Sequence, residues 1–267
     1  MRELQLLSEW ADTIIGKYTD RQVVVEGGNI FKAPGFTKEN PVMITDRISK
    51  SEVPYTTKYL EQLTGLQLAN NLLGSTGQAE TSGDMDIAID MHKVSKDALT
   101  QKLLDQGVKP EELKRSGDNV HYCSPIYDAN GKTDRFVQVD FMFVPDVPFA
   151  LWSMRTAPDS SYKGVYLQKL RNDLVKTADP NWKWHHFQGV LQRTDNANVF
   201  GSDPDKIAKG LIGPKATRAD LESVERVLAA IKEHRQDIDT QVRDTYRNTL
   251  AKDTNEKKPQ VWESVKY

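Results

Sequence analysis

The chain contains a single cysteine, Cys123, among its 267 residues. One cysteine can form neither an intramolecular disulfide nor a zinc site built from cysteines, and this scarcity suits a reducing compartment. No apolar run approaches the roughly 20 residues that a membrane-spanning helix needs. Acids interrupt the apolar residues at the start of the chain, so no signal peptide is predicted. We therefore expect a soluble, cytoplasmic protein with no membrane partner.

The chain also lacks an excess of either charge. Its 36 Lys and Arg residues are balanced by 38 Asp and Glu residues, which gives a formal net charge of −2. Non-specific nucleic-acid binding usually requires a basic surface, so the sequence gives no strong evidence for DNA binding, although a local basic groove stays open. We find no internal repeat and no low-complexity block. With 38% hydrophobic residues, the chain can form one large domain or two smaller ones.

Apolar periodicity predicts an α/β (α+β) fold: a small sheet of mixed or antiparallel strands with flanking helices, followed by a helical C-terminal region. We predict a domain at 1–150, with its core at about 56–145 and an N-terminal elaboration at 1–55, and a mainly helical domain at 151–267. The predicted helices are 4–15, Thr56 or Thr57 to Leu63 with Gly65 as its stop, 97–106, 161–178, 207–211, 221–231 and a charged helix to about 250. The predicted strands are 23–25, a short strand-like entry at 71–75, 84–90, and a hairpin of 120–127 and 136–144 turned by Asn130-Gly131.

Three aspartates on two of these strands predict a metal site. Because side chains alternate along a strand, Asp84 and Asp86 share the face opposite the apolar residues of DMDIAID. Two neighbouring carboxylates repel each other unless a proton or a cation separates them. The pair alone is also compatible with an exposed strand edge. Asp140 interrupts the otherwise apolar RFVQVDFMFV, and a neighbouring strand can bring it beside the pair to complete a site for divalent metal ions.

A Gly-Ser pair, Gly74-Ser75, precedes the first acid by about ten residues. Glycine lets the backbone approach a ligand closely, and serine offers a hydroxyl and an N–H group. A turn of this kind directs N–H groups at phosphate oxygens. Most Gly-Ser pairs are ordinary turns, but the spacing to Asp-x-Asp and the later Asp make this one more specific.

This pattern resembles the nucleotidyltransferase superfamily, whose best-known member is DNA polymerase beta. The family pattern is Gly-Ser, a spacer, Asp-hydrophobic-Asp and a distant Asp, here Gly74-Ser75, Asp84-Met85-Asp86 and Asp140. The segment AETSGDMD is similar to the corresponding segment of the polymerase, and the resemblance covers about residues 59–144. Thr76, Gly77 and Gln78 replace the aromatic residue and two arginines that follow Gly-Ser in the polymerase. No helix-hairpin-helix signature is present, so templated DNA synthesis is not supported.

The resemblance implies a nucleotidyltransferase-type fold and the transfer of a nucleoside monophosphate from a nucleoside triphosphate, such as ATP, to an acceptor hydroxyl. Asp84, Asp86 and Asp140 are the implied catalytic residues and the ligands of two Mg²⁺ ions, which Mn²⁺ can replace, with Asp140 also a possible general base. The acceptor, a small molecule, an RNA or a protein, stays open. The implied substrate-binding residues are Gly74, Ser75 and Thr76. Candidates for the cations that replace the missing arginines, by residue type and rough location, are Lys163, Lys58, Lys169 and Arg171, and each of them can instead be a solvated surface charge.

Several alternatives stay open. The chain can be a template-independent or repair-type polymerase of the same superfamily, or a catalytically silent copy that serves as a binding or assembly module. The presence of all three acids argues against the silent copy. Tyr162 can stack on a base, or it can be a half-buried residue at a helix start. His185 and His186, which point apart in a strand, predict aromatic packing rather than a metal site, and Cys123 predicts a small buried side chain.

Overall fold

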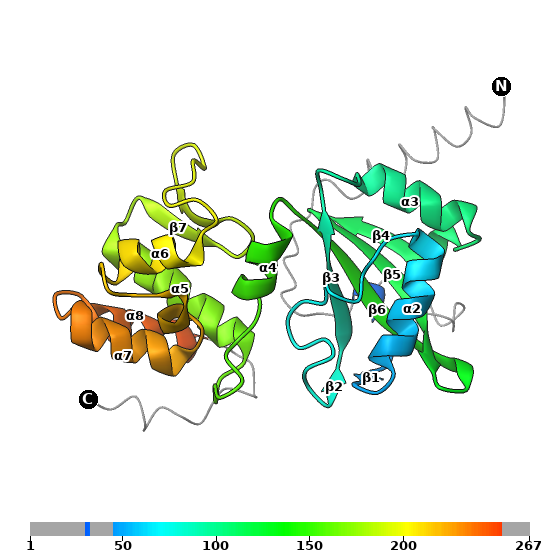
Figure 1. Cartoon of the computed structure of the whole chain (residues 1–267), viewed down its shortest axis with the longest axis horizontal. Coiled ribbons are helices and arrows are strands. Elements are labelled where there is room, and N and C mark those ends of the chain that lie inside the picture. Colours follow the sequence, from blue (N-terminus) through cyan, green and yellow to red (C-terminus); the bar gives the residue numbers. More distant parts are fainter. Residues whose placement is uncertain (1–29, 33–44, 253–267) are drawn as a thin grey trace.

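The computed structural model describes residues 30–32 and 45–252, which form a mixed α/β protein (Figure 1). The helix predicted at 4–15 and the strand predicted at 23–25 lie outside the described residues. Within them, no helix combines the length and the apolar character that crossing a membrane requires. The elements are η1 (Ile30–Lys32), β1 (Ile48–Ser49), α2 (Val53–Thr64), β2 (Thr81–Ser82), β3 (Asp84–Asp90), α3 (Lys96–Asp105), η3 (Pro110–Glu112), β4 (Leu113–Ser116), β5 (Asn119–Asp128), β6 (Gly131–Val144), α4 (Val147–Ser153), α5 (Gly164–Ala178), β7 (Trp182–His185), β8 (Gly189–Gln192), α6 (Pro204–Leu211), η4 (Arg218–Leu221), α7 (Val224–His234) and α8 (Asp239–Ala251).

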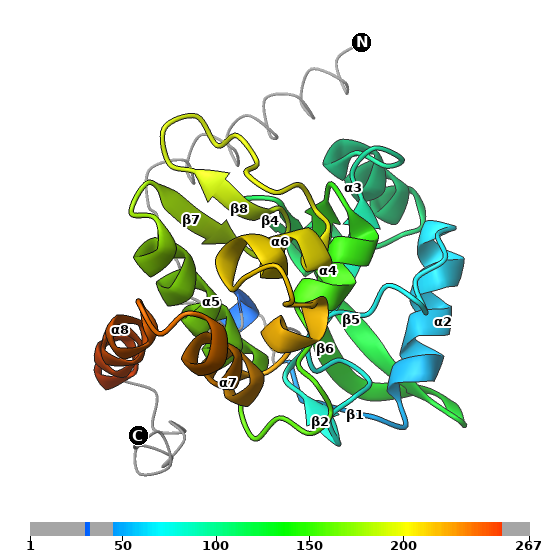
Figure 2. The same ribbon diagram turned by 60° about the vertical axis from the view of Figure 1, so that its left-hand side comes forward.

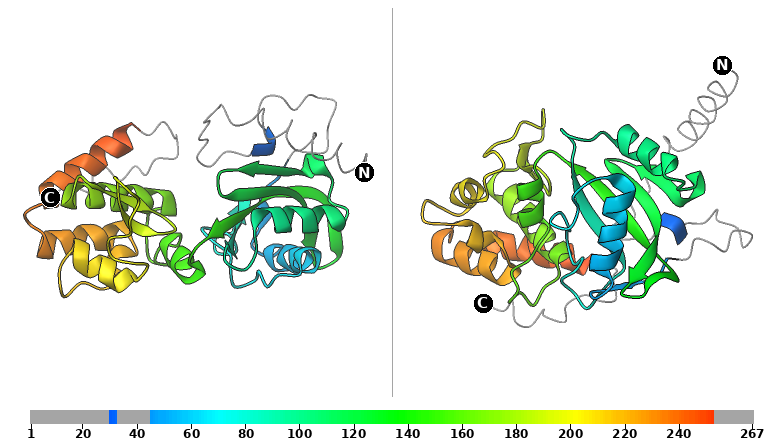
Figure 3. Two further views of the ribbon diagram at one scale, coloured as in Figure 1. Left: turned by 90° about the horizontal axis from the view of Figure 1, so that it is seen from above. Right: turned by 45° about the vertical axis from the view of Figure 1, so that its right-hand side comes forward.

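A four-stranded mixed sheet in the order β3-β6-β5-β4 forms the centre of the N-terminal part. Strand β3 runs parallel to β6, whereas the other two pairs are antiparallel. Helices α2 and α3 cover one face of this sheet, and η1 lies over the opposite face (Figure 3). The prediction of a mixed sheet with flanking helices is confirmed at this level.

Strand β3 follows the predicted period of two. Met85, Ile87 and Ile89 are buried in the cluster that also contains apolar residues of α2 and α3. Ala88, on the face of the acids, is buried as well, in a smaller cluster with Ala150 of α4. The acid-bearing face of the sheet is therefore only partly open, because α4 packs near the C-terminal end of β3.

The β5–β6 hairpin is confirmed, and its turn is tighter than predicted. Asp128 pairs with Gly131, which leaves two residues in the loop. Of the predicted turn residues Asn130 and Gly131, only Gly131 has a positive φ, +115°. Strand β4 was not predicted, because its sequence LKRS is polar and lies at the sheet edge, where one side of the strand needs no apolar partner.

Helix α2 begins at Val53, so the prediction that Thr56 or Thr57 caps it is wrong. Both threonines are buried inside the helix, and the hydroxyl of Thr56 interacts with the backbone of Tyr127 on β5. The predicted end is confirmed, since Gly65 closes the helix with φ +73°.

The C-terminal part has a hydrophobic core of its own. Helices α5, α6, α7 and α8 pack with the β7–β8 hairpin around a cluster that runs in sequence from Phe149 to Leu250 (Figure 2). The sequence predicts a helical region here, and the β7–β8 hairpin was not predicted. Helix α5 begins at Gly164 rather than Ser161, and Val165, expected on its apolar face, is exposed. The division into domains 1–150 and 151–267 stays a prediction.

Cys123 is buried, as expected for a small core side chain, and packs with Phe31 of η1. Burial, with a smaller contribution from Glu112, raises the pKa of its thiol to about 12. Because the thiolate is the reactive form, we expect Ellman's reagent at pH 8 to detect no thiol in the native protein and one equivalent after unfolding in guanidinium. Stoichiometric labelling of the native protein would contradict this burial.

Candidate functional site

The register of the parallel β3–β6 pair brings the three predicted acids together. Asp84 lies opposite Gln138, and Asp86 lies opposite Asp140, so all three carboxylates project from the same face. Carboxylate oxygens of the three residues lie within 4.8 Å of one another. Asp140 is buried, with 8% of its surface exposed, whereas Asp84 and Asp86 are half-buried.

The three carboxylates repel one another electrostatically. The pKa of Asp86 is raised well above its ordinary value by burial and then by the charges of Asp84 and Asp140. The pKa of Asp84 is raised by burial and by Asp140, although the positive charge of Arg47 acts in the opposite direction. Additional positive charge would favour the ionised form of both groups. A divalent cation would supply that charge.

The Gly-Ser turn is attached directly to Asp86. The N–H group of Leu73 donates to the carbonyl of Asp86 at 2.8 Å, and the N–H group of Asp86 donates to the hydroxyl of Thr76 at 3.1 Å. The segment 71–75, predicted as strand-like, makes a single antiparallel bridge, between Leu72 and Ile87, before it turns. The turn therefore fixes the backbone from which the Asp86 carboxylate projects.

Gly74 approaches that carboxylate closely. Its φ is +57°, and a Cβ atom at this position would lie 3.3 Å from Oδ2 of Asp86. The position therefore requires glycine both for its left-handed backbone and for the space that the carboxylate occupies.

Replacing Gly74 with alanine is expected to weaken divalent-metal binding as well as to destabilise the fold by about 1–2 kcal/mol, the usual cost of the left-handed conformation. Gly65→Ala is a matched control, because Gly65 has φ +73° and a Cβ atom added there would meet nothing within 4 Å. Thermal unfolding with and without Mn²⁺ separates the two effects. Equal Mn²⁺ stabilisation of both variants would contradict a site role for Gly74.

The two residues after Gly74 differ in their exposure. Ser75 is exposed, and its hydroxyl lies 3.4 Å from that of the buried Ser82. Thr76 is buried and its hydroxyl accepts a hydrogen bond from Asp86. The Thr76 side chain thus positions Asp86, and its predicted substrate contact stays a prediction.

Arg47 lies near Asp84, and its positive charge opposes the rise in the pKa of that carboxyl. A role for Arg47 was not predicted from the sequence. Its Nε and Nη2 atoms donate to Oγ1 and the carbonyl of Thr81, at 3.0 and 2.8 Å. Its Nη1 atom is 3.4 Å from the place that a Cβ atom on Gly83, the residue before Asp84, would occupy. Strand β1, which carries the next residue, pairs with β2 over only two residues. Pairing this short leaves no periodicity in the sequence, so no local signal identifies Arg47.

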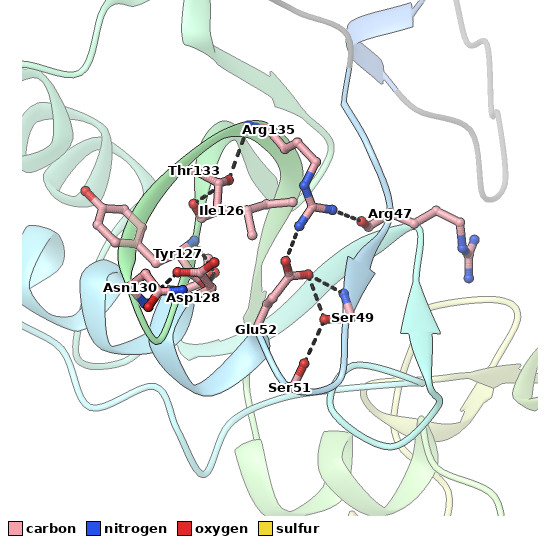
Figure 4. Close-up of polar contacts among 11 residues, drawn as sticks. Arg47, Ser49, Ser51, Glu52, Ile126, Tyr127, Asp128, Asn130, Thr133 and Arg135 are labelled. Carbon is pink, nitrogen blue, oxygen red and sulfur yellow. Dashed lines mark hydrogen bonds and ion pairs between the residues drawn. The ribbon is translucent and has the colours of Figure 1, made fainter.

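A partly buried polar network holds the backbone at Arg47. Glu52 accepts hydrogen bonds from the N–H and hydroxyl groups of Ser49 and pairs with Arg135, which also donates to the Arg47 carbonyl at 3.4 Å. Burial alone would raise the pKa of Glu52, but Ser49 and Arg135 leave it below its ordinary value. Figure 4 shows this network, with the Arg47 side chain pointing away from Arg135. The Arg47 guanidinium thus extends from an anchored backbone.

The other predicted nucleotide-contacting residues lie in different surroundings. Tyr162 is buried in the C-terminal core, which does not fit stacking on a base. Lys163, the residue before α5, and Lys58 on α2 are exposed, and their predicted roles stay predictions, as does that of Lys169. Arg171 is fully buried and donates to the carbonyls of Ser153 and Leu221. The prediction that Arg171 binds a triphosphate is therefore wrong.

The histidine pair belongs to an aromatic cluster, as predicted. His185 and His186 stack with ring centroids 5.1 Å apart and planes at 8°, so the expectation that they point apart is wrong. His186 also contacts Phe187, and burial lowers its pKa to about 4. Within the described part of the chain, the only group of acids, histidines and cysteines that can hold a metal is the aspartate cluster.

Asp140 also ends a chain of hydrogen bonds. The Ser116 hydroxyl lies 2.7 Å from His121 Nε2, and His121 Nδ1 lies 2.7 Å from Asp140 Oδ1. The order of contacts is that of a serine-hydrolase relay. However, the Asp140 carboxylate is clustered with those of Asp84 and Asp86, which have no function in such a relay. The carboxylate cluster is therefore the feature that defines the site.

The chain matches no known family model, and a search of curated proteins finds no matching sequence either. Three clustered carboxylates form a hard, oxygen-only ligand set, which suits Mg²⁺ or Mn²⁺ better than zinc or copper.

Proposed function

We propose that this protein is a metal-dependent nucleotidyltransferase with a fold of the DNA polymerase beta type. The observation that carries the proposal is the β3–β6 register, which places Asp84, Asp86 and Asp140 within 4.8 Å of one another beside the Gly74-Ser75 turn. Two further features support it. Gly74 lies against the Asp86 carboxylate, and Arg47 supplies a positive charge that acts on Asp84.

The cluster fits divalent ions on chemical grounds. Burial, and after it the like charges of the cluster, raises the pKa values of Asp84 and Asp86. Asp84 and Asp86 would hold one Mg²⁺ and share a second with Asp140. When bound, these ions would neutralise phosphate charge and lower the pKa of the acceptor hydroxyl.

In the proposed reaction the acceptor oxygen forms a bond to the α-phosphorus of the nucleoside triphosphate, and the bond from that phosphorus to the pyrophosphate oxygen breaks. Pyrophosphate leaves, and the acceptor proton passes to Asp140 as general base. Ser75 and the backbone of the turn bind the terminal phosphates, and Arg47 adds positive charge to them. Positioning and charge neutralisation therefore account for most of the catalysis.

Arg47 takes over the role of the two arginines that follow Gly-Ser in the polymerase. Replacing Arg47 with alanine should weaken triphosphate binding about 10- to 100-fold, as expected for the loss of charge-assisted hydrogen bonds. Arg47→Lys should lie in between, because lysine keeps the charge but cannot reproduce the paired contacts with Thr81. Arg193→Ala, which removes an exposed arginine of the C-terminal part, is the control. Unchanged affinity in Arg47→Ala, measured by calorimetry, would remove Arg47 from the site.

The proposal is tested by incubating the protein with each of the four α-³²P-labelled ribonucleoside triphosphates, Mg²⁺ or Mn²⁺, and acceptors of each class: small alcohols, RNA and protein. We expect the label to pass to an acceptor as unlabelled pyrophosphate is released, with one preferred base, and this transfer to be lost in Asp140→Asn. Metal-dependent binding of a triphosphate, without transfer or pyrophosphate release for any combination of triphosphate and acceptor, would instead favour the silent binding module. Templated extension of a primed nucleic acid would favour the polymerase alternative.

A further inference from the structure

Asp140 differs from the other two acids in the support that its side chain receives. Gln138 Nε2 donates to its Oδ2 atom at 3.0 Å, and His121 Nδ1 lies 2.7 Å from its Oδ1 atom. Among the described residues, no side-chain hydrogen bond of this kind is made to the carboxylates of Asp84 or Asp86. Asp140 is thus the one carboxylate of the cluster whose plane is fixed from both sides.

The sheet register produces this arrangement. Asp86, Asp140, His121 and Lys114 lie opposite one another on β3, β6, β5 and β4, so they form a row across one face. Gln138 lies two residues before Asp140 on β6 and therefore shares that face. Both partners are buried, His121 with 5% and Gln138 with 3% of their surface exposed. The hydrogen bonds are therefore protected from competition by solvent.

Each partner is in turn held at its far end. The Ser116 hydroxyl lies 2.7 Å from His121 Nε2, and the N–H group of Ile30 donates to Gln138 Oε1 at 2.8 Å. An ionised Asp140 accepts from Nδ1–H, which leaves Nε2 to accept from the serine. The orientation of the Gln138 amide is fixed in the same way, because its nitrogen donates to the Asp140 carboxylate and its oxygen accepts from Ile30. All the hydrogen-bonding atoms around Asp140 therefore have defined partners.

We propose that His121 and Gln138 are positioning residues, which orient the Asp140 carboxylate so that one lone pair on each oxygen stays available to a divalent metal ion. A carboxylate offers about four lone-pair sites, and the two donors occupy one on each oxygen. Hydrogen-bonded partners of this kind orient metal ligands, and their removal typically costs 10- to 100-fold in metal affinity or activity. This inference rests on the proposed function for its catalytic consequence but makes its own prediction for metal binding.

The test compares His121→Asn with His121→Gln. The asparagine amide nitrogen reaches about the position of the imidazole Nδ1 atom, whereas the glutamine nitrogen reaches that of Nε2, so only asparagine keeps the donor to Asp140. We expect His121→Gln and Gln138→Leu to weaken Mn²⁺ binding roughly 10- to 100-fold, with His121→Asn close to the wild type. Ser116→Ala, which removes only the outer anchor, should have a smaller effect. Mn²⁺ binding is measured by electron paramagnetic resonance without nucleotide.

The kinetic arm measures kcat and KM for the triphosphate in the same variants. Because Ser75 and Arg47 bind the phosphates, His121→Gln should lower kcat and leave KM nearly unchanged.

Wild-type Mn²⁺ affinity in both His121→Gln and Gln138→Leu would overturn the positioning role while leaving the proposed function intact. A wild type that binds Mn²⁺ with the expected variant pattern but transfers no nucleotide would refute the proposed function and support the positioning role. Complete loss of Mn²⁺ binding in Ser116→Ala, or no Mn²⁺ binding by the wild type, would contradict the positioning role.

Discussion

Replacing Asp86 with asparagine is expected to reduce metal-dependent nucleotidyl transfer strongly and to stabilise the metal-free protein at the same time. Burial and the charges of Asp84 and Asp140 raise the pKa of Asp86 well above its ordinary value. A carboxyl group shifted in this direction carries no penalty below its unfolded-state pKa, and the penalty develops as the pH rises through the folded-state pKa. At neutral to alkaline pH, asparagine therefore removes an unfavourable charge. It also removes a metal ligand, which should lower kcat by on the order of 10²–10³.

These opposite effects are measured by thermal unfolding at pH 5 and pH 8, in EDTA and in Mg²⁺. The wild type should gain stability from Mg²⁺, and more at pH 8, because binding must release the protons of carboxyls with raised pKa values. Asp86→Asn should be more stable than the wild type in EDTA at pH 8 and should not respond to Mg²⁺. Asp90→Asn is the matched control, because Asp90 ends the same strand and pairs with Lys93 outside the cluster. Equal Mg²⁺ stabilisation of Asp86→Asn and the wild type would contradict the site.

The second large effect concerns Arg171 and is a loss of stability. This fully buried side chain donates two hydrogen bonds to the carbonyl of Leu221, at 3.0 and 2.6 Å, and one to that of Ser153 at 2.7 Å. Its guanidinium also lies over the rings of Trp152 and Trp184, at 4.6 and 5.3 Å from their centroids. It thereby joins the ends of α4 and η4 to α5. Arg171→Met would leave two buried carbonyls without these donors, and we expect a cost of about 3–5 kcal/mol.

Urea unfolding followed by circular dichroism measures this cost. Arg171→Lys should also be destabilised, because one ammonium group cannot reach both carbonyls and contact both indole rings. Arg193→Met, at an exposed position, is the control. A cost below about 1 kcal/mol for Arg171→Met, which is the level of an ordinary surface change, would show that Arg171 does not hold these elements together.

The fold was predictable where one face of an element is uniformly apolar. Met85, Ile87 and Ile89 alternate with polar residues and identify β3, and Gly65 and Gly131 mark an observed helix end and hairpin turn. The β4 strand and the start of α2 were not predictable in this way. Strand β4 is a polar edge strand. The start of α2 places threonines inside the helix, where the hydroxyl of Thr56 interacts with the backbone of Tyr127.

The candidate site was predictable in its carboxylates and not in what surrounds them. Asp140 stood out because an acid inside an apolar strand needs a partner. Arg47 and His121 reach the cluster only through strand pairings, over two residues for β1–β2 and across the sheet for β5–β6. Neither pairing leaves a local pattern in the sequence. The prediction for Arg171 was wrong because a cation on a helix is typical of a solvated or ligand-facing charge. The burial of Arg171 depends on tertiary contacts with two tryptophans, which the local sequence does not indicate.

The central claim is that the three carboxylates bind a divalent metal together with a nucleoside triphosphate. Isothermal titration of non-hydrolysable analogues of ATP, CTP, GTP and UTP, with and without Mg²⁺, tests it most directly in the wild type and in Asp86→Asn. Saturable binding of at least one analogue by the wild type that requires Mg²⁺, and its loss in Asp86→Asn, is the predicted result. Absence of Mg²⁺-dependent binding of all four analogues to the wild type would contradict the account.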